Sequence, residues 1–438
     1  MHDIIIVQDN RLIGGAGNGA KTDTRAKSFA DENRIMTGAC VVDLAGYELE
    51  PLRDDGDFSL YRARKRSDPV SVLALVATRA DSVGVKRLER EYGLAALLDS
   101  SWAARPLALY RHREPPMLVL DDNGGEPLDR SLASPFELAR LLRIAVNLAK
   151  VVGHVHRCGL VHKDIKPANV LVDSSGNVRL TGFGIASQLP HEHQPPAPPE
   201  IVAGSFAYMA PEQTGRMNRS IDTRSDLYAF GVTLYEMLTG SLPFKATDSM
   251  EWIHCHIARK PTPPRARRDA IPQVVEGIVL KLLAKAAEDR YQTAAGLEAD
   301  LRSCLAAWEA HHRIEPFPLG RHDASDQLLI PEKLYGREAQ IEALTTAFDR
   351  VVGSGSVELV LISGYPGIGK SSVVNELHRV LVPPRGLFAS GKFDQYRRGI
   401  PYVPFAQAFQ TLVRNLLSKR EAEVEPWRCA LMLSLIHI

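Results

Sequence analysis

The chain has 438 residues, enough for two or three domains, and its 45% apolar and 24% charged residues are ordinary for a globular protein. Lysine and arginine (53) balance aspartate and glutamate (52), which argues against a general attraction to nucleic acid or an anionic membrane. Five scattered cysteines without a CxxC pair argue against a disulfide framework or a cysteine-based zinc site. No apolar run reaches the ~18 residues of a membrane span, and no basic signal region opens the chain, so we expect a cytoplasmic protein.

The first 130 residues predict an extension followed by a strand-rich unit. Residues 1–40 read as irregular. Their segment Gly14–Thr22 resembles a phosphate-binding loop, but one residue separates its last glycine from its lysine. From 41 to 130 we expect strands and loops with one helix. The clearest strands are expected at Val70–Ala77 and Met117–Leu120, and the helix at Lys86–Leu98.

The next part of the chain, from 131 to 310, predicts a mainly helical unit. Ser134 and Pro135 suit the cap and the first turn of a helix that runs to about His156. Amphipathic patterns then recur along this part at helical spacing. Further helices are expected at Ser225–Thr239, Met250–Ala258, Gln273–Ala286 and Thr293–Trp308.

A run of eight residues within the helical part indicates phosphoryl transfer. It reads HKDIKPAN over residues 162–169 and fits the pattern H-x-D-x-x-x-x-N. Such a transfer needs positioned groups more than covalent chemistry. Asp164 is the candidate base that accepts a hydroxyl proton, and Asn169 is the candidate metal ligand.

Later motifs agree with this run in order and spacing. Gly204–Glu212 (GSFAYMAPE) resembles the segment that closes the activation loop of a protein kinase. Asp226 opens a pattern similar to the helix that supports the catalytic loop, and Arg290 stands where the family pairs an arginine with Glu212. Over roughly residues 41–310 the chain therefore resembles a protein kinase of the Ser/Thr type.

The resemblance carries expectations about fold and chemistry. It implies an α+β bilobal protein-kinase fold with an N-lobe at 41–130 and a C-lobe at 131–310. It also implies ATP and Mg²⁺ as cofactors and a protein substrate or signalling partner. Lys166 would touch the transferred phosphate, and the pair of Arg290 with Glu212 would be structural rather than catalytic.

Three features depart from the kinase pattern. Gly182 stands where the family has the metal-binding aspartate of D-F-G, so one metal contact is lost. The strand at Val70–Ala77 contains no lysine, which leaves Glu91 without its usual partner; Arg79 is the nearest cation. No G-x-G-x-x-G loop precedes that strand, because Asp54–Asp57 offers one glycine and three acids.

These departures leave two readings open. Each tenfold loss of rate corresponds to about 1.4 kcal/mol of barrier, and losing a metal ligand and the phosphate lysine costs several such factors. In the first reading, Asn169, one metal ion and a relocated cation suffice for transfer to protein serine or threonine. In the second, the domain is a regulatory pseudokinase or scaffold, controlled by the domain that follows.

That following domain contains a second phosphate-binding motif. Residues 311–334 form a polar linker, a helix is expected to about Val352, and Val357–Ser363 reads as a buried strand. The strand leads into GYPGIGKS at 364–371, which matches GxxxxGK[ST] and predicts the start of an α/β P-loop NTPase domain with a helix at Ser372–Val380. Lys370 would bind ATP phosphates and Ser371 would bind Mg²⁺. The expected phosphate-binding residues are Gly364, Gly367, Gly369, Lys370 and Ser371.

The order of these motifs resembles a family of large bacterial signalling proteins. In that family a Ser/Thr kinase domain precedes an AAA-like ATPase domain, and some members continue into GAF and sensor histidine kinase domains. Here the ATPase domain at 335–438 is expected to be incomplete, because no apolar strand ending in an acid follows the P-loop. The apolar run at 431–438 is expected to be a truncated or misassembled end.

Overall fold

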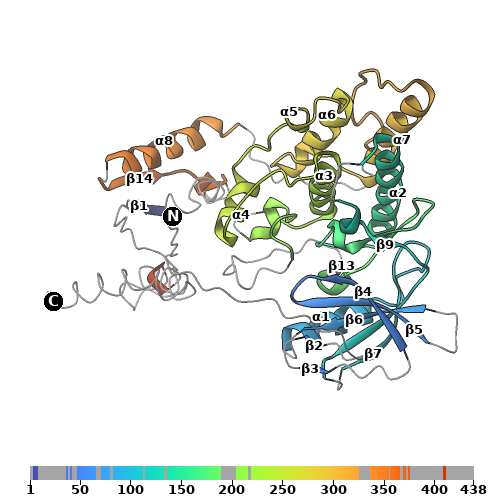
Figure 1. The fold of residues 1–438 in the computed structure, drawn as a ribbon. Helices are drawn as coiled ribbons and strands as arrows, with labels where there is room; N and C mark the ends of the chain where they lie inside the picture. Colours follow the sequence, from blue (N-terminus) through green and yellow to red (C-terminus); the bar gives the residue numbers. More distant parts are fainter. Residues whose placement is uncertain are drawn as a thin grey trace, which may run out of the picture.

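The structure, a computed structural model, contains a β-rich lobe, a helical lobe and part of a further α/β unit (Figure 1). The predicted α+β bilobal fold followed by an α/β unit is therefore confirmed. The residues that the structure describes are 3–7, 36–37, 40–41, 47–65, 71–78, 82–111, 114–132, 136–188, 204–215, 219–324, 336–354, 356–365, 368–370, 373–374 and 408–410.

The β-rich lobe is a five-stranded antiparallel sheet in the order β4-β5-β6-β8-β7. The strands predicted at Val70–Ala77 and Met117–Leu120 are present as β6 and β8. Leucines on one face of the sheet form an apolar cluster that also takes in Leu171 of the helical lobe. The five strands are β4 (Tyr47–Asp54), β5 (Phe58–Lys65), β6 (Ser71–Ala77), β7 (Pro106–Tyr110) and β8 (Met117–Asp121).

The one helix among the described residues of this lobe, α1 (Ser82–Gly93), differs from the expected Lys86–Leu98. It begins four residues earlier and ends at Gly93. Except for proline, glycine has the lowest helix propensity of all residues, so it favours the end of the helix there. The predicted apolar face is therefore cut short, and Tyr92 is 41% exposed. The buried face instead carries Leu88 and, three residues on, Glu91, each 1% exposed.

The helical lobe is built around α2 and α3, which each carry more of its buried side chains than any other described helix. The helix expected to open at Ser134 and Pro135, which lie outside the described residues, begins at Leu138 because Glu137 caps it by accepting from the Ala139 N–H. Of the described helices, none combines the length and apolar character that a membrane crossing needs. The helices are α2 (Leu138–Arg157), α3 (Thr223–Thr239), α4 (Ser249–Ile257), α5 (Pro264–Arg267), α6 (Gln273–Leu282) and α7 (Ala294–His311).

Short elements between the lobes hold the 162–169 loop. One small sheet has the order β12-β11-β9, and β10 pairs with β13 on the other side of the loop. These strands are β9 (Glu126–Pro127), β10 (Leu160–Val161), β11 (Val170–Val172), β12 (Val178–Leu180) and β13 (Ser187–Gln188). The 3₁₀ turns are η1 (Leu128–Ser131), η2 (Pro167–Asn169), η3 (Phe183–Ile185), η5 (Pro211–Thr214) and η6 (Ala287–Asp289).

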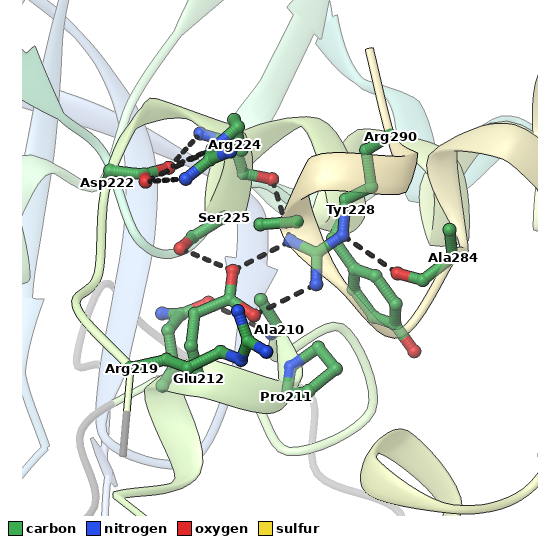
Figure 2. A network of polar contacts seen from close by, with 12 residues as sticks. Ala210, Pro211, Glu212, Arg219, Asp222, Arg224, Ser225, Tyr228, Ala284 and Arg290 are labelled. Atoms are coloured by element: carbon green, nitrogen blue, oxygen red, sulfur yellow. Dashed lines mark hydrogen bonds and ion pairs between the residues drawn. The ribbon is translucent and has the colours of Figure 1, made fainter. Parts of the chain in front are cut away.

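A buried ion pair joins the end of the Gly204–Glu212 segment to the helical lobe (Figure 2). Arg290 donates to both carboxylate oxygens of Glu212, at 2.7 and 2.9 Å, and Ser225 donates to the same carboxylate at 2.7 Å. Burial would raise the pKa of Glu212, but Arg290 and Ser225 hold it below its usual value. The guanidinium also donates to the backbone oxygens of Ala284, Arg224 and Lys285. The structural role predicted for this pair is thus supported by its geometry.

The further unit contains α8 (Glu338–Ser354) and β14 (Glu358–Ile362), a helix and a strand at the predicted places. The strand is not buried as expected, because Leu359 and Leu361 are 68% and 63% exposed. The backbone of β14 pairs antiparallel with β1 (Asp3–Val7). The extension expected to be irregular at 1–40 therefore contributes a strand, as its β-branched run favours. Its other described parts are the paired strands β2 (Met36–Thr37) and β3 (Cys40–Val41). The helix predicted at Ser372–Val380 lies outside the described residues, apart from 373–374.

Replacing Arg290 by alanine is expected to lower the free energy of unfolding by about 3–5 kcal/mol, because Glu212 is then buried without its partner. Equilibrium denaturation of the variant measures the loss. Arg302→Ala is the matched control, since Arg302 pairs with Glu298 at 2.6 Å on an exposed helix surface and should cost less than about 1 kcal/mol. Equal losses in both variants would contradict the structural role of the buried pair.

Candidate functional site

The 162–169 loop is held by one buried carboxylate. Asp226, at the start of α3, accepts from the backbone N–H groups of His162 (2.9 Å) and Lys163 (2.8 Å). His156 Nε2 lies 2.9 Å from the same carboxylate. Burial would raise the pKa of Asp226, but His156 and the His162 N–H keep it below its usual value. Lys163 adopts φ +68°, a left-handed conformation that is costly for a residue other than glycine. The hydrogen bonds to Asp226 hold the loop in this conformation.

The three predicted catalytic residues converge at this loop. Asn169 Nδ2 donates to Asp164 Oδ2 at 3.0 Å, and Lys166 Nζ lies 3.3 Å from that oxygen. The Ser205 N–H donates to Asp164 Oδ1 at 3.0 Å, and Lys166 donates to Ser205 Oγ at 2.7 Å. Burial would raise the pKa of Asp164, but Lys166 and His162 lower it below its usual value. Asp164 is therefore a carboxylate at neutral pH and can accept a proton or a hydrogen bond.

The residues around Asn169 do not fit a kinase metal site. Mg²⁺ requires several oxygen ligands in near-octahedral geometry. The side-chain oxygen of Asn169 already accepts a hydrogen bond from Arg53 Nη1, and Gly182 has no side chain to contribute. Gly182 has φ +82°, and a Cβ atom there would lie 2.8 Å from Asn169 Oδ1. The role of Asn169 as a metal ligand therefore stays a prediction from the sequence.

Among the described residues of the sheet, no lysine pairs with Glu91. Leu75 of β6 lines the cleft together with Glu91, and the Oε1 atom of Glu91 has no hydrogen-bond partner among the described residues. Burial raises the pKa of Glu91 to about 7, although the N–H groups of residues 182–184 and the charge of Arg53 oppose this shift. Arg79, the cation named from the sequence, lies outside the described residues.

Arg53 is the cleft residue that the sequence reasoning missed. Its side chain is 4% exposed, and it donates to the Ala168 oxygen at 2.8 Å as well as to Asn169. The available signal was its position directly before the acidic turn Asp54–Asp57, where a glycine-rich loop would begin. Arg53 therefore stands where the kinase pattern has the start of a glycine-rich loop, whose backbone would wrap a phosphate.

The cleft between the lobes is small, and charged side chains that line it pair with one another. Its cavity is about 240 Å³, below the ~300–1,000 Å³ typical of ligand pockets. Lys166 donates to Asp55 Oδ2 at 3.4 Å, so a carboxylate from the turn after β4 contacts this cation of the cleft. Leu60 and Leu73 of the sheet and Leu171 of β11 are at most 1% exposed in one apolar cluster. The two lobes therefore meet through their own side chains.

The described part of the second motif has the form of a phosphate loop. It follows β14, and Gly369 adopts φ +89°, a conformation that favours glycine. Lys370 Nζ donates to the backbone oxygens of Gly364 and Tyr365, each at 3.0 Å, so the lysine folds over the loop. Arg337 donates to the Ile368 oxygen at 3.3 Å, which ties the start of the domain to the loop. Of the predicted phosphate-binding residues, Gly367 and Ser371 lie outside the described residues.

Gly182→Ala is expected to destabilise the protein more than Gly176→Ala. The two glycines have nearly the same φ, +82° and +83°, so the backbone strain of about 1–2 kcal/mol is common to both. A Cβ atom meets nothing within 4 Å at Gly176 but collides with the buried Asn169 at Gly182. Denaturant unfolding should show an additional loss of about 1–3 kcal/mol for Gly182→Ala. Equal losses would contradict the close approach.

Glu91→Gln is expected to flatten the pH dependence of stability. The pKa of Glu91 is about 7 in the folded state against an ordinary 4.5, so its stabilising proton uptake is complete below about pH 4.5 and lost as the pH rises through 7. Between pH 5 and 8 the wild type should lose up to about 3 kcal/mol through this group, and the variant should not. Unfolding at several pH values measures this difference. Glu89→Gln, on the exposed side of the same helix, should keep the wild-type slope.

Comparison with known proteins agrees with the two-domain organisation of the chain. Residues 56–301 match the protein kinase domain, and residues 333–436 match the AAA ATPase domain. Serine/threonine-protein kinase PknB of Mycobacterium tuberculosis is 35% identical over 38% of this chain and 26% of its own length. Serine/threonine-protein kinase Pkn1 of Myxococcus xanthus is 35% identical over 44% of this chain and 28% of its own length.

A third relative matches a larger share of this chain. Hybrid signal transduction histidine kinase G of Dictyostelium discoideum is 26% identical over 68% of this chain, which covers 11% of that protein. The chain thus spans less than a third of each of these relatives. The predicted order, a Ser/Thr kinase domain followed by an AAA-like ATPase domain, is confirmed. Since the kinase match covers more than half of the chain, the chain belongs to the protein kinase domain family and continues into an AAA ATPase domain.

Proposed function

We propose that this chain is part of a signalling protein whose kinase domain is a regulatory pseudokinase and whose ATPase domain is the principal ATP-binding part. The observation that carries the proposal is the state of Asn169. Its side-chain oxygen accepts a hydrogen bond from Arg53, and Gly182 supplies no second ligand, so among the described residues neither of these two positions offers a divalent metal a free donor. Phosphoryl transfer depends on that metal to neutralise charge on the phosphates.

The proposal also draws on the cleft as a whole. A leucine stands beside Glu91 where transfer requires a lysine to hold the nucleotide, and the small cavity is already crossed by the ion pair of Lys166 with Asp55. In the ATPase domain, the fold of Lys370 over its loop supports a phosphate-binding role. Mg²⁺ would be held there by Ser371 when ATP is bound.

An active Ser/Thr kinase is the second candidate. It is favoured by the arrangement of Asp164, Lys166 and Asn169, which lie within hydrogen-bond or ion-pair distance of one another. The names of two relatives point the same way, since PknB and Pkn1 are both serine/threonine-protein kinases. The signalling role is supported by the name of the third relative, a hybrid signal transduction histidine kinase.

Purified wild type, Asp164→Ala and Lys370→Ala should separate these functions. With Mg-ATP and a generic protein substrate, phosphate transfer by the wild type should not exceed that of Asp164→Ala. ATP binding should be retained in Asp164→Ala and fall at least tenfold in Lys370→Ala, which lacks the phosphate lysine. Lys245→Ala, which removes an exposed lysine of the helical lobe, is the control for the loss of charge. Transfer by the wild type that disappears in Asp164→Ala would establish the active kinase instead.

A further inference from the structure

Arg53 reaches the cleft because of an irregularity in β4. The pairing of β4 with β5 shifts in register between Pro51 and Arg53. Neighbours in a regular strand point to opposite faces, whereas a bulge re-aims a side chain. Leu52 and Arg53 are adjacent, yet both are buried, at 3% and 8% exposure. The bulge therefore sends a guanidinium group into the cleft, beneath the sheet and against the 162–169 loop.

The partners of this guanidinium are all oxygen atoms in the part of the chain that the structure describes. Arg53 Nη1 donates to the backbone oxygen of Ala168 at 2.8 Å and to Asn169 Oδ1. Its Nε atom lies 3.7 Å from Asp55 Oδ2 and makes no hydrogen bond. The Glu91 carboxylate is near enough for the charge of Arg53 to oppose the rise of its pKa. Amide, carbonyl and carboxylate oxygens are the ligands that hard divalent cations take in proteins.

We propose that Arg53 takes the place of the divalent metal ion in this cleft. The inference rests on the proposed pseudokinase function and names the group that substitutes for the metal. A guanidinium cannot lose its charge in a protein, so the site carries a permanent cation. A divalent ion beside it is repelled across a few ångströms of partly desolvated space. Gly182 is part of the same substitution of an arginine for a metal ion. Any side chain at position 182 would collide with the side chain of Asn169, whose oxygen accepts a hydrogen bond from Arg53.

The built-in cation also joins the two lobes. Arg53 belongs to the sheet, and its acceptors, Ala168 and Asn169, belong to the loop of the helical lobe. A second link runs in the opposite direction, from Lys166 of the loop to Asp55 of the turn after β4. The closed arrangement of the lobes therefore needs neither a metal ion nor a nucleotide to neutralise the acids between them.

Thermal unfolding of the nucleotide-free chain, with and without millimolar MgCl₂ or MnCl₂, tests the proposal. The Tm of the kinase-domain transition should be unaffected by either metal in the wild type. Arg53→Ala should lower this Tm by on the order of 10 °C, because Asp55 and Glu91 lose their cation. Either metal should then restore at least half of the loss, since oxygen ligands are left around the vacated position. Arg64→Ala, which removes an exposed arginine of the same sheet, should change neither the Tm nor its metal dependence.

Arg53→Gln provides a second variant if the alanine variant does not fold. It is neutral, retains a hydrogen-bond donor for Ala168, and should also gain a metal-dependent rise in Tm. Stabilisation of the wild type by either metal would overturn the proposal, as would the absence of metal rescue in the variant that folds. Neither result bears on phosphate transfer, because no nucleotide is present. Transfer by the wild type would instead defeat the proposed function.

Discussion

The carboxylate of Asp226 orders the centre of this molecule. It is fully buried and binds two consecutive backbone N–H groups of the 162–169 loop, so the loop has one conformation even though Lys163 must adopt a left-handed φ. Buried charge must be compensated, and here His156 and the loop amides provide the compensation. The positions of Asp164, Lys166 and Asn169 depend on this anchor, because all three belong to the loop that it holds.

In this chain the interactions that support the kinase fold are retained, whereas ligand-binding groups of the kinase pattern are not. The supports are present: Asp226 holds the loop, and the pair of Glu212 with Arg290 holds the segment that follows it (Figure 2). Two ligand-binding features of the kinase pattern are missing from the sequence, since Gly182 stands at the position of the metal-binding aspartate and Asp54–Asp57 offers one glycine and three acids instead of a glycine-rich loop. A fold can therefore be retained by interactions that are independent of its chemistry, and function has to be argued from the site.

The two nucleotide-binding motifs of the chain have opposite surroundings. The kinase cleft is lined by charges that pair with one another, as Lys166 does with Asp55, and by leucines that seal the lobes together. At the P-loop, Lys370 contacts only backbone oxygens among the described residues, and its Nζ atom is free of any ion pair there. An ammonium group held by neutral carbonyls can bind a phosphate without first losing a carboxylate partner. This contrast is the physical ground for the proposal that ATP binds chiefly to the second domain.

Short motifs with fixed spacing were enough to predict the fold class, the order of the domains and the identity of the loop residues, because such motifs specify local geometry. The sequence also predicted that Glu91 lacks a lysine partner, since β6 contains none. Which cation enters the cleft depends on contacts that form in the folded chain. The pairing shift between Pro51 and Arg53 is a relation between two strands, and it turns Arg53 toward Asn169, 116 positions along the chain. No local pattern encodes such a contact, because it joins a side chain of the sheet to acceptors in a loop of the other lobe, far away along the chain.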